Sequence, residues 1–297
     1  MTPAAALSAT APALFIVLWS TGFISAKLSV TLVEPFTFLS LRFSFVIALM
    51  LPLAVLWRAR WPRTLRETGH IAVAGILMQG GYLSGCFTAM HLGMSAGVIA
   101  LIMGLQPIVT AFAAMPLLGE SVSIMQWVGL TLGFGGVALV VWQKVSLHSL
   151  DAVTIPWSLL GLIGITAGAL YQKRFCANFD VRTGSVIQFS AALLLVLPVA
   201  LLTETMNVIW SSGFIVALAW SVLAVSIGAI SLFFYLIEHG EATRVSSLFY
   251  LAPPTTAAMA YFAFGETLTL STLAGMIISI TGVALVVRKP NLAAPEP

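Results

Sequence analysis

Apolar stretches of about 20 residues recur along nearly the whole chain, and they constrain its fold more than any other feature. That length is what a helix needs to cross the hydrocarbon core of a bilayer. Backbone inside lipid must also satisfy its own hydrogen bonds, which favours helices. We therefore predict an all-α integral membrane protein with ten transmembrane helices. The ten stretches are residues 11–32, 36–57, 69–91, 95–118, 122–143, 156–176, 184–203, 211–237, 243–264 and 269–287.

Composition supports a membrane protein and excludes several other classes. Charged residues make up only 8% of the chain, against about a quarter in soluble domains. The net charge of +3 comes with no basic stripe, so we expect no nucleic-acid partner. Cys86 and Cys176 lack CxxC spacing and the four histidines lack metal-ligand spacing, so we expect no metal and no cofactor.

The positions of lysine and arginine predict the orientation. With the N-terminus inside, ten of these residues fall in inside loops and two in outside loops, as the positive-inside rule requires. Both termini are then cytoplasmic, in a multi-pass protein of the bacterial inner membrane. The N-terminus has no basic region before its first apolar stretch, so we interpret that stretch as a retained helix. The inside residues are Arg58, Arg60, Arg63, Arg66, Lys173, Arg174, Arg182, Arg244, Arg288 and Lys289.

The two halves of the sequence repeat one another at an offset of 146 residues. Gly119-Glu120 aligns with Gly265-Glu266, Pro107 with Pro253, and the run Val137–Val141 with Val283–Val287. A constant offset over most of the chain indicates a duplication. The predicted units are residues 1–147 and 152–290, followed by a disordered tail at 291–297.

Each predicted half holds five spans, an odd number, so the second copy must enter the bilayer with the opposite orientation. Inverted repeats of this kind place a substrate site between the halves near the middle of the membrane. Rocking of one half against the other then exposes the site to each side in turn. A duplicated membrane anchor without transport is the alternative.

Each half carries a proline in its fourth span, Gly-Glu after that span, and GVALVV in its fifth. In this doubled order the sequence resembles the EamA-type drug/metabolite transporter superfamily over about residues 10–288, and within it the YddG group of bacterial amino-acid exporters. The resemblance implies a ten-helix exporter whose central cavity is lined by spans one, three, four, six, eight and nine. It also implies that spans five and ten lie at the periphery.

No acidic, basic or histidine side chain lies in the middle of those six lining spans. Such a charge would be costly and would mark an ion path. We therefore expect an uncharged cavity and a substrate that is neutral overall, zwitterionic or amphipathic. Arg42, in the second span, is expected to pair locally, with Glu34 as one possible partner, or to extend to the lipid headgroups.

Polar side chains in the first half are candidate substrate ligands. Gln79 and Tyr82 lie about one helical turn apart and can share a face. Gln106 precedes Pro107, whose missing N–H loosens the helix and frees carbonyl groups that could hold an ammonium. Trp19 in the first span is a further candidate for the cavity lining. The alternative for Gln79 and Gln106 is hydrogen bonding between helices.

The second half supplies matching candidates. Pro253 and Pro254 interrupt the ninth span opposite the break at Pro107, and interruptions at matching positions point to a transport site. A static kink is the alternative. The further candidate ligands, which include one from the first span, are Ser20, Tyr171, Ser246 and Tyr250. For Tyr171, an aromatic anchor at the membrane interface is the alternative.

Charged residues at the span ends repeat as well. Lys27 and Lys173 are gate candidates, for which extension to headgroups is the alternative interpretation. Glu120 and Glu266 are expected to cap the helix that follows each of them.

These observations predict an alternating-access transporter that exports amino acids, aromatic and other neutral or zwitterionic ones, or similar small metabolites. It is expected to act as a monomer, with a small-molecule substrate and the lipid bilayer as its partners. The alternatives are an exporter of other amphipathic metabolites or drugs and, less favoured, an integral membrane enzyme. An enzyme would need a positioned acid, base, nucleophile or metal cluster, and the sequence contains no such motif.

Overall fold

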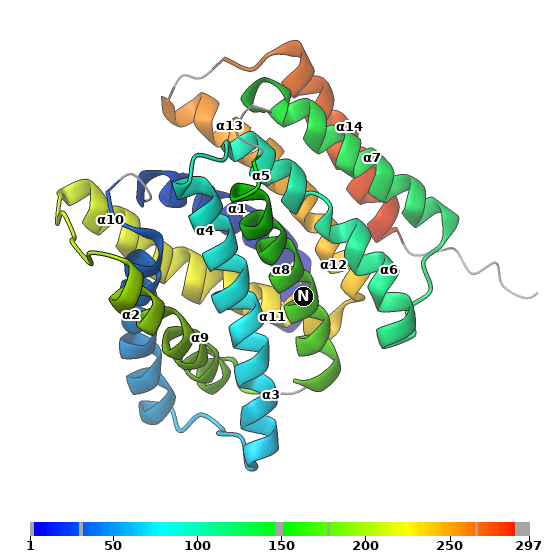
Figure 1. The fold of residues 1–297 in the computed structure, drawn as a ribbon. Coiled ribbons are helices and arrows are strands. Elements are labelled where there is room, and N and C mark those ends of the chain that lie inside the picture. Colours follow the sequence, from blue (N-terminus) through cyan, green and yellow to red (C-terminus); the bar gives the residue numbers. More distant parts are fainter. Residues whose placement is uncertain (1–2, 30–31, 146–150, 177–178, 265–266, 289–297) are drawn as a thin grey trace, which may run out of the picture.

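The computed structural model describes residues 3–29, 32–145, 151–176, 179–264 and 267–288, and every regular element in these ranges is helical. The helices pack into one bundle (Figure 1). The α-helices are α1 (Pro3–Ser29), α2 (Pro35–Leu56), α3 (Leu65–Gly75), α4 (Tyr82–His91), α5 (Ala96–Met103), α6 (Gln106–Leu118), α7 (Ile124–Val141), α8 (Thr154–Phe175), α9 (Val181–Thr203), α10 (Ser212–Trp220), α11 (Ile230–His239), α12 (Ala242–Ser247), α13 (Ala252–Phe264) and α14 (Leu270–Val287).

Eight helical segments of the described chain are long and apolar enough to cross a membrane, so this is a multi-pass membrane protein. Three of them combine two α-helices: Leu65–His91 contains α3 and α4, Ala96–Leu118 contains α5 and α6, and Ser212–His239 contains α10 and α11. The first and the last of these joints are π-helical, at η1 (Ile76–Gly81) and η4 (Ser221–Ala229). The eight do not include α1 or α13, so ten transmembrane helices stay a prediction.

The predicted breaks in the fourth and ninth spans are present. A two-residue gap separates α5 from α6, and Pro107 is the second residue of α6. The ninth span changes to a 3-10 turn, η5 (Leu248–Leu251), before α13 begins. Helix bounds also recur along the chain: α14 begins and ends 146 residues after α7, and α12 begins 146 residues after α5.

Glycines bring α7 and α14 into direct backbone contact along one edge of the bundle (Figure 1). A Cβ on Gly282 would lie 2.5 Å from the Gly133 nitrogen, and one on Gly275 would lie 2.6 Å from the Gly136 oxygen. Small residues allow this approach because they leave no side chain between the backbones. These two helices form a closely packed pair.

Helices α2 and α9 form a second pair, which is tied at both ends. The Glu204 carboxylate accepts hydrogen bonds from the backbone N–H groups of Phe36 and Thr37, 2.9 and 2.6 Å away, at the first turn of α2. At the opposite end of this pair, the Thr183 hydroxyl donates to the Arg60 carbonyl oxygen. A carboxylate beside the free N–H groups of a helix N-terminus is stabilising.

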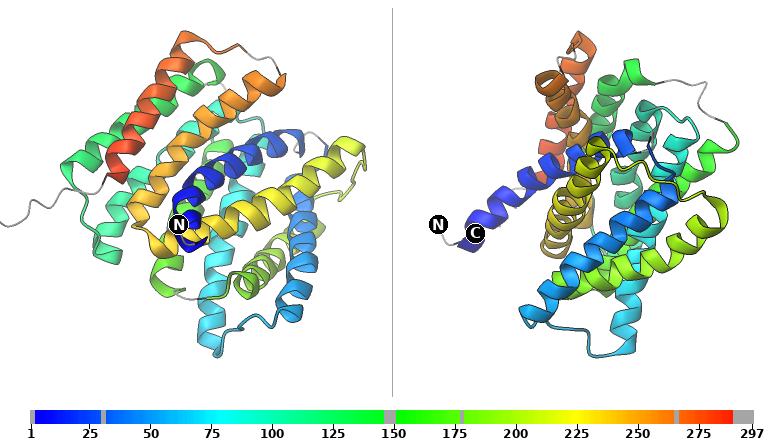
Figure 2. Two further views of the ribbon diagram at one scale, coloured as in Figure 1. Left: turned by 180° about the vertical axis from the view of Figure 1, so that it is seen from behind. Right: turned by 90° about the vertical axis from the view of Figure 1, so that its left-hand side faces the viewer.

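Helix α1 crosses the bundle between these two pairs. It packs against η4 and α11 on one side and against α13 on the other (Figure 2). The middle of α1 therefore lies in the interior, next to the broken spans.

Asp180 caps α9 and provides a prediction for acid stability. Its carboxylate accepts hydrogen bonds from the Arg182 side chain and from the Arg182 and Arg60 backbone N–H groups, and these bonds, the Arg182 side chain first, lower its pKa. A carboxylate whose pKa is lowered by folding stabilises the folded state at pH values above its ordinary pKa. This contribution is lost as the pH falls through the folded-state pKa. We expect D180N to melt at a lower temperature than the parent at pH 7, with the difference disappearing in strong acid. A melting series in detergent from pH 7 down to pH 2 checks this, and a difference independent of pH would contradict it.

Candidate functional site

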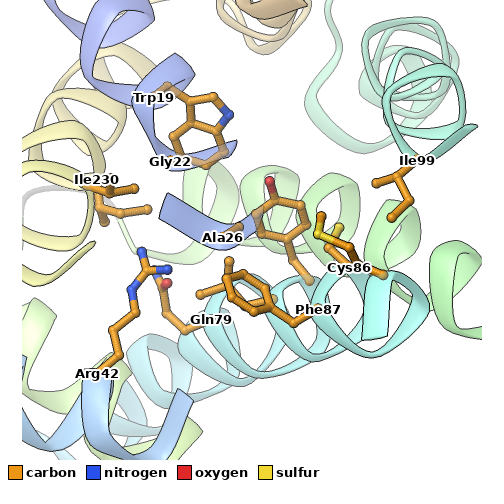
Figure 3. Close-up of a pocket in the computed structure, with 13 residues that line it drawn as sticks. Trp19, Gly22, Ala26, Arg42, Gln79, Cys86, Phe87, Ile99 and Ile230 are labelled. Carbon is orange, nitrogen blue, oxygen red and sulfur yellow. The ribbon is translucent and has the colours of Figure 1, made fainter. Parts of the chain in front are cut away.

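Two cavities lie in the interior on either side of one aromatic pair. Trp19 of α1 and Tyr82 of α4 line both cavities, and their rings stack with centroids 6.0 Å apart and planes 13° apart. Cavity A, of about 50 Å³, is lined by Trp19, Gly22, Ala26, Arg42, Gln79, Tyr82, Leu83, Cys86, Phe87, Met90, Ile99, Val225 and Ile230 (Figure 3). Cavity B, of about 40 Å³, is lined by Trp19, Tyr82, Ala100, Met103, Gly104, Gln106, Val137, Ile165, Phe249, Ala252 and Pro253.

Each cavity is small for a binding site. Binding pockets for small molecules usually measure about 300–1,000 Å³, whereas cavity A measures about 50 Å³ and cavity B about 40 Å³. The stacked Trp19 and Tyr82 rings are the side chains that the two cavities share. Separation of these rings would join the cavities into one space.

Aromatic rings surround the shared pair. Trp19 packs edge-on against Phe249 of η5 with ring centroids 4.9 Å apart, and Phe15 lies 5.4 Å from Trp19. Aromatic contacts of this geometry contribute about 0.5–1.5 kcal/mol each beyond burial. The cluster joins α1, α4 and the 3-10 turn of the ninth span, so movement of any of these elements moves the ring between the cavities.

Gln79 and Tyr82 line cavity A together, as their spacing predicts. Gln79 is completely buried in η1, and neither atom of its side-chain amide has a hydrogen-bond partner among the described residues. Buried polar groups in folded proteins are nearly always paired. The lone amide in a cavity wall is therefore available to a ligand.

Arg42 corrects two predictions. Its side chain is only 4% exposed and lines cavity A, and its Nε donates a 2.8 Å hydrogen bond to Ser226 Oγ. It does not extend to the headgroups, and Glu34 is not its partner, because the Glu34 carboxylate accepts hydrogen bonds from Thr205 instead. The prediction of an uncharged cavity lined by six spans is wrong, because α2 contributes a guanidinium.

Gln106 lies at the entrance to α6, where the helix is broken. It is buried and lines cavity B, and its Nε2 donates to Thr110 Oγ1 at 3.2 Å. Its Oε1 has no partner in the described part of the chain. Pro107 supplies no N–H to the preceding turn. Cavity B is thus lined by a free carbonyl-type oxygen beside a helix break.

Three candidates from the sequence line neither cavity. The Ser20 hydroxyl donates to the carbonyl oxygens of Ile16 and Ala252, so it connects α1 to α13. The Ser246 hydroxyl donates within its own helix, to the Ala242 carbonyl oxygen. Tyr250 turns toward α7 instead of the cavity, because Gly133 leaves the space that its ring fills.

Tyr171 also lies elsewhere. Its hydroxyl is 2.8 Å from His70 Nδ1, and the ring lines a separate apolar groove that includes Leu117 and Arg174. Tyr171 lies near the end of α8, a position typical of aromatic residues at the membrane interface and away from the central site.

The gate candidates differ in what the structure describes. The described residues do not include the side chain of Lys27, and they do not include Glu266. The predicted disordered tail, residues 291–297, also lies outside them. Lys173 pairs with Glu120, Nζ to Oε1 at 3.4 Å, and donates to the Gly240 carbonyl. Glu120 does not cap the helix that follows it. Its carboxylate accepts from the N–H groups of Ala242 and Thr243, at the start of α12.

Met90 lines cavity A and Met103 lines cavity B, whereas Met94 is buried and lines neither. Sequence reasoning missed the cavity-lining roles of Cys86 and Phe249. Periodicity carries no signal for them, because nearly every face of these helices is apolar.

The double proline of the ninth span provides a prediction for transport. Pro253 and Pro254 lie in the first turn of α13, directly after η5, and Pro253 lines cavity B. A proline inside a continuous helix costs about 3 kcal/mol, so alanine at both positions stabilises a straight ninth span. We expect slower transport with normal folding. The measurement is the transport rate of P253A/P254A compared with that of P116A, a control that replaces an exposed proline of α6. Equal flux in both variants would show that the break serves architecture alone.

Known transporters and one solved structure are similar to this protein over nearly the whole chain. The EamA-like transporter family matches residues 7–142 and again residues 153–288. The uncharacterized transporter YvbV of Bacillus subtilis (strain 168) is 27% identical over 279 residues, covering 93% of this chain and 90% of that protein. The uncharacterized inner membrane transporter YedA of Escherichia coli (strain K12) is 23% identical over 282 residues, covering 95% and 90%. A solved crystal structure covers 93% of this chain and 96% of its own with a TM-score of 0.75 and 18% identity, a likeness of fold alone.

Proposed function

Because the chain belongs to the EamA-like transporter family, we propose that it is an alternating-access exporter of amino acids, or of similar small zwitterionic metabolites, across the bacterial inner membrane. The observation that carries this proposal is the pair of small cavities that meet at Trp19 and Tyr82. Free polar groups line both cavities, Gln79 in one and Gln106 in the other. Apart from these groups, the Arg42 guanidinium and the Tyr82 hydroxyl, the lining is apolar, which suits an amphipathic molecule with separated polar groups.

Two inverted halves, with both termini cytoplasmic, give this proposal its mechanism. Supporting observations are the two family matches, the second of which begins and ends 146 residues after the first, and the helix bounds that recur at the same offset. The closely packed pairs α2–α9 and α7–α14 each join equivalent helices of the two halves. We assign them the role of a static frame.

The helices between these pairs are the moving parts in this mechanism. Breaks or π-helical segments interrupt the third, fourth, eighth and ninth spans, and such segments adjust their backbone at lower cost than a continuous α-helix. Contacts between the halves hold one side closed: Glu120 of the first half binds Lys173 and the start of α12 in the second. In the proposed topology this is the cytoplasmic side.

Cavity B suits the ammonium group of an amino acid. A cation inside a membrane protein needs oxygen ligands to replace its water. Gln106 Oε1 is buried and has no partner in the described part of the chain, and Pro107 beside it supplies no N–H to the preceding turn. Side chains of varied shape would lie against the methionines and aromatic rings, since thioethers adapt to different neighbours.

Transport by purified protein in proteoliposomes tests the proposal. Labelled phenylalanine is expected to accumulate in loaded vesicles that contain the protein and not in protein-free vesicles, with chemically unchanged label inside. Competition with other amino acids, nucleosides and cationic dyes then defines the substrate class. Competition by dyes or nucleosides alone would favour an exporter of other amphipathic compounds, and chemical conversion of the label would favour an enzyme.

A further inference from the structure

Arg42 is a buried charge without a carboxylate partner among the described residues. It lies inside α2, is 4% exposed, and within the described part of the chain has one hydrogen bond, from Nε to Ser226 Oγ. Every acidic residue that the structure describes binds other groups or lies at the surface. Those residues are Glu34, Glu67, Glu120, Asp151, Asp180, Glu204, Glu238 and Glu241.

A guanidinium inside a membrane protein is costly unless an anion or strong hydrogen-bond acceptors compensate it. One neutral hydroxyl compensates little of this charge. An unpaired ionisable side chain in a membrane span is by default a functional group. The compensating group must therefore come from outside the described residues, and cavity A is the space that the side chain reaches.

The geometry selects the kind of anion. Because Nε is bonded to Ser226, the edge formed by the two Nη groups remains, and this edge matches the two oxygens of a carboxylate. Gln79 lies beside it with an unpartnered Nε2 that can donate to the same group. Figure 3 shows the ends of Arg42 and Gln79 next to each other at one side of the cavity, with Trp19 on the opposite side.

The equivalent position of the other half carries no charge. Gln188 follows Arg42 by the 146-residue offset, and its Nε2 donates to Gln172 Oε1 at 2.8 Å. Gln188 is buried in α9 and lines neither cavity. A packing role at this depth is thus met by a neutral amide pair, so packing of α2 does not by itself require an arginine.

We propose that Arg42 and Gln79 form an anion anchor that binds the carboxylate group of the transported molecule in cavity A. The inference rests on the proposed function and narrows it: the substrate must carry a carboxylate, whereas its ammonium is dispensable for binding. Monocarboxylates that lack the ammonium are therefore ligands, and amines that lack the carboxylate are not.

Cys86 allows binding to be measured without transport. Its thiol is free and buried, and it lines cavity A together with Arg42. In a C176S background, a ligand in the cavity shields Cys86 from a maleimide reagent. We would compare 3-phenylpropionate with 3-phenylpropanamide, which has the same shape and no charge, and with 2-phenylethylamine. The half-protecting concentration of the propionate is expected to be at least about tenfold lower than that of the other two.

Variants assign the effect to the anchor. In R42Q, the propionate and the amide are expected to protect Cys86 equally. In R42K, part of the preference for the propionate should remain, because lysine keeps the positive charge but lacks the two Nη groups that bind both carboxylate oxygens. Q79E places a carboxylate beside Arg42 and should remove the preference while compensating the buried charge. Q188A is the matched control, expected to bind as the parent does.

Each outcome decides one claim. Equal protection by propionate and amide in the parent protein, or a preference that persists in folded R42Q or Q79E, would overturn the anchor. If R42Q does not fold, the parent comparison and Q79E still decide. Preference for propionate without phenylalanine transport would reject the amino-acid proposal and leave the anchor standing. Phenylalanine transport without a preference for the propionate would reject the anchor and leave the amino-acid proposal standing.

Discussion

Alanine at both Gln79 and Tyr82 is expected to reduce amino-acid flux at least about tenfold, because removal of hydrogen bonds to a charged group costs about 1.5–3 kcal/mol. Both side chains line cavity A, and Tyr82 also forms half of the ring pair that separates the cavities. The Gln79 amide has no partner among the described residues to lose, whereas removal of the Tyr82 ring also removes its stacking on Trp19, so flux is compared per amount of folded protein.

The matched control for this variant lies on the same helix. Ser84 and Thr88 are buried in α4, and their hydroxyls have no partner among the residues that the structure describes, yet they line neither cavity. S84A/T88A should transport as the parent does. Initial rates in proteoliposomes, normalised to reconstituted protein, provide the measurement. Equal rates in the two double variants would remove Gln79 and Tyr82 from the transport path.

Leucine at Gly282 is expected to cause the largest loss of stability. The new Cβ alone would lie 2.5 Å from the Gly133 nitrogen and 2.6 Å from the Gly129 oxygen. These are backbone atoms and cannot turn aside, so α14 must move away from α7. Overpacking of this kind costs about 3 kcal/mol or more, which corresponds to a melting temperature lower by roughly 10 °C.

Gly135 offers a matched control in the same pair of helices. A Cβ there meets nothing within 4 Å, so G135L should melt close to the parent. Thermal unfolding in detergent, followed by the loss of the monodisperse peak on size exclusion, compares the two variants. If G282L is as stable as G135L, the close contact between α7 and α14 does not hold the frame together.

The sequence predicts the helical spans because lipid imposes a simple rule on them. Eight of the ten predicted spans correspond to described helices of sufficient length and apolarity, and the breaks near Pro107 and Pro253 are present. Some helices begin earlier than the apolar stretch predicts, because their first turn is polar. Helix α3 begins at Leu65 instead of residue 69, because Thr64 caps it and the polar residues after that cap are helical too.

The site is less predictable because membrane helices are apolar on nearly every face, so periodicity does not show which side turns inward. Gln79, Tyr82, Gln106 and Trp19 could be selected as polar or aromatic exceptions, and all four line the cavities. Tyr250 meets the same criterion and turns toward Gly133, a packing detail that depends on another helix.

Arg42 carries a functional signal that is already visible in the sequence. As the one charged residue well inside the second predicted span, it deserved a functional interpretation by default. Only the tertiary structure places its guanidinium beside Gln79, because the second span is not among the lining spans that the family resemblance implies. The charge of the cavity follows from that packing.

The account depends on a central cavity that opens to each side of the membrane in turn, and Cys86 reports on this directly. In C176S protein, a membrane-impermeant maleimide would be applied to right-side-out and to inside-out vesicles. We predict labelling of Cys86 from both sides and protection by a carboxylate ligand on each. Labelling from one side only, under every ligand condition, would contradict alternating access through this cavity.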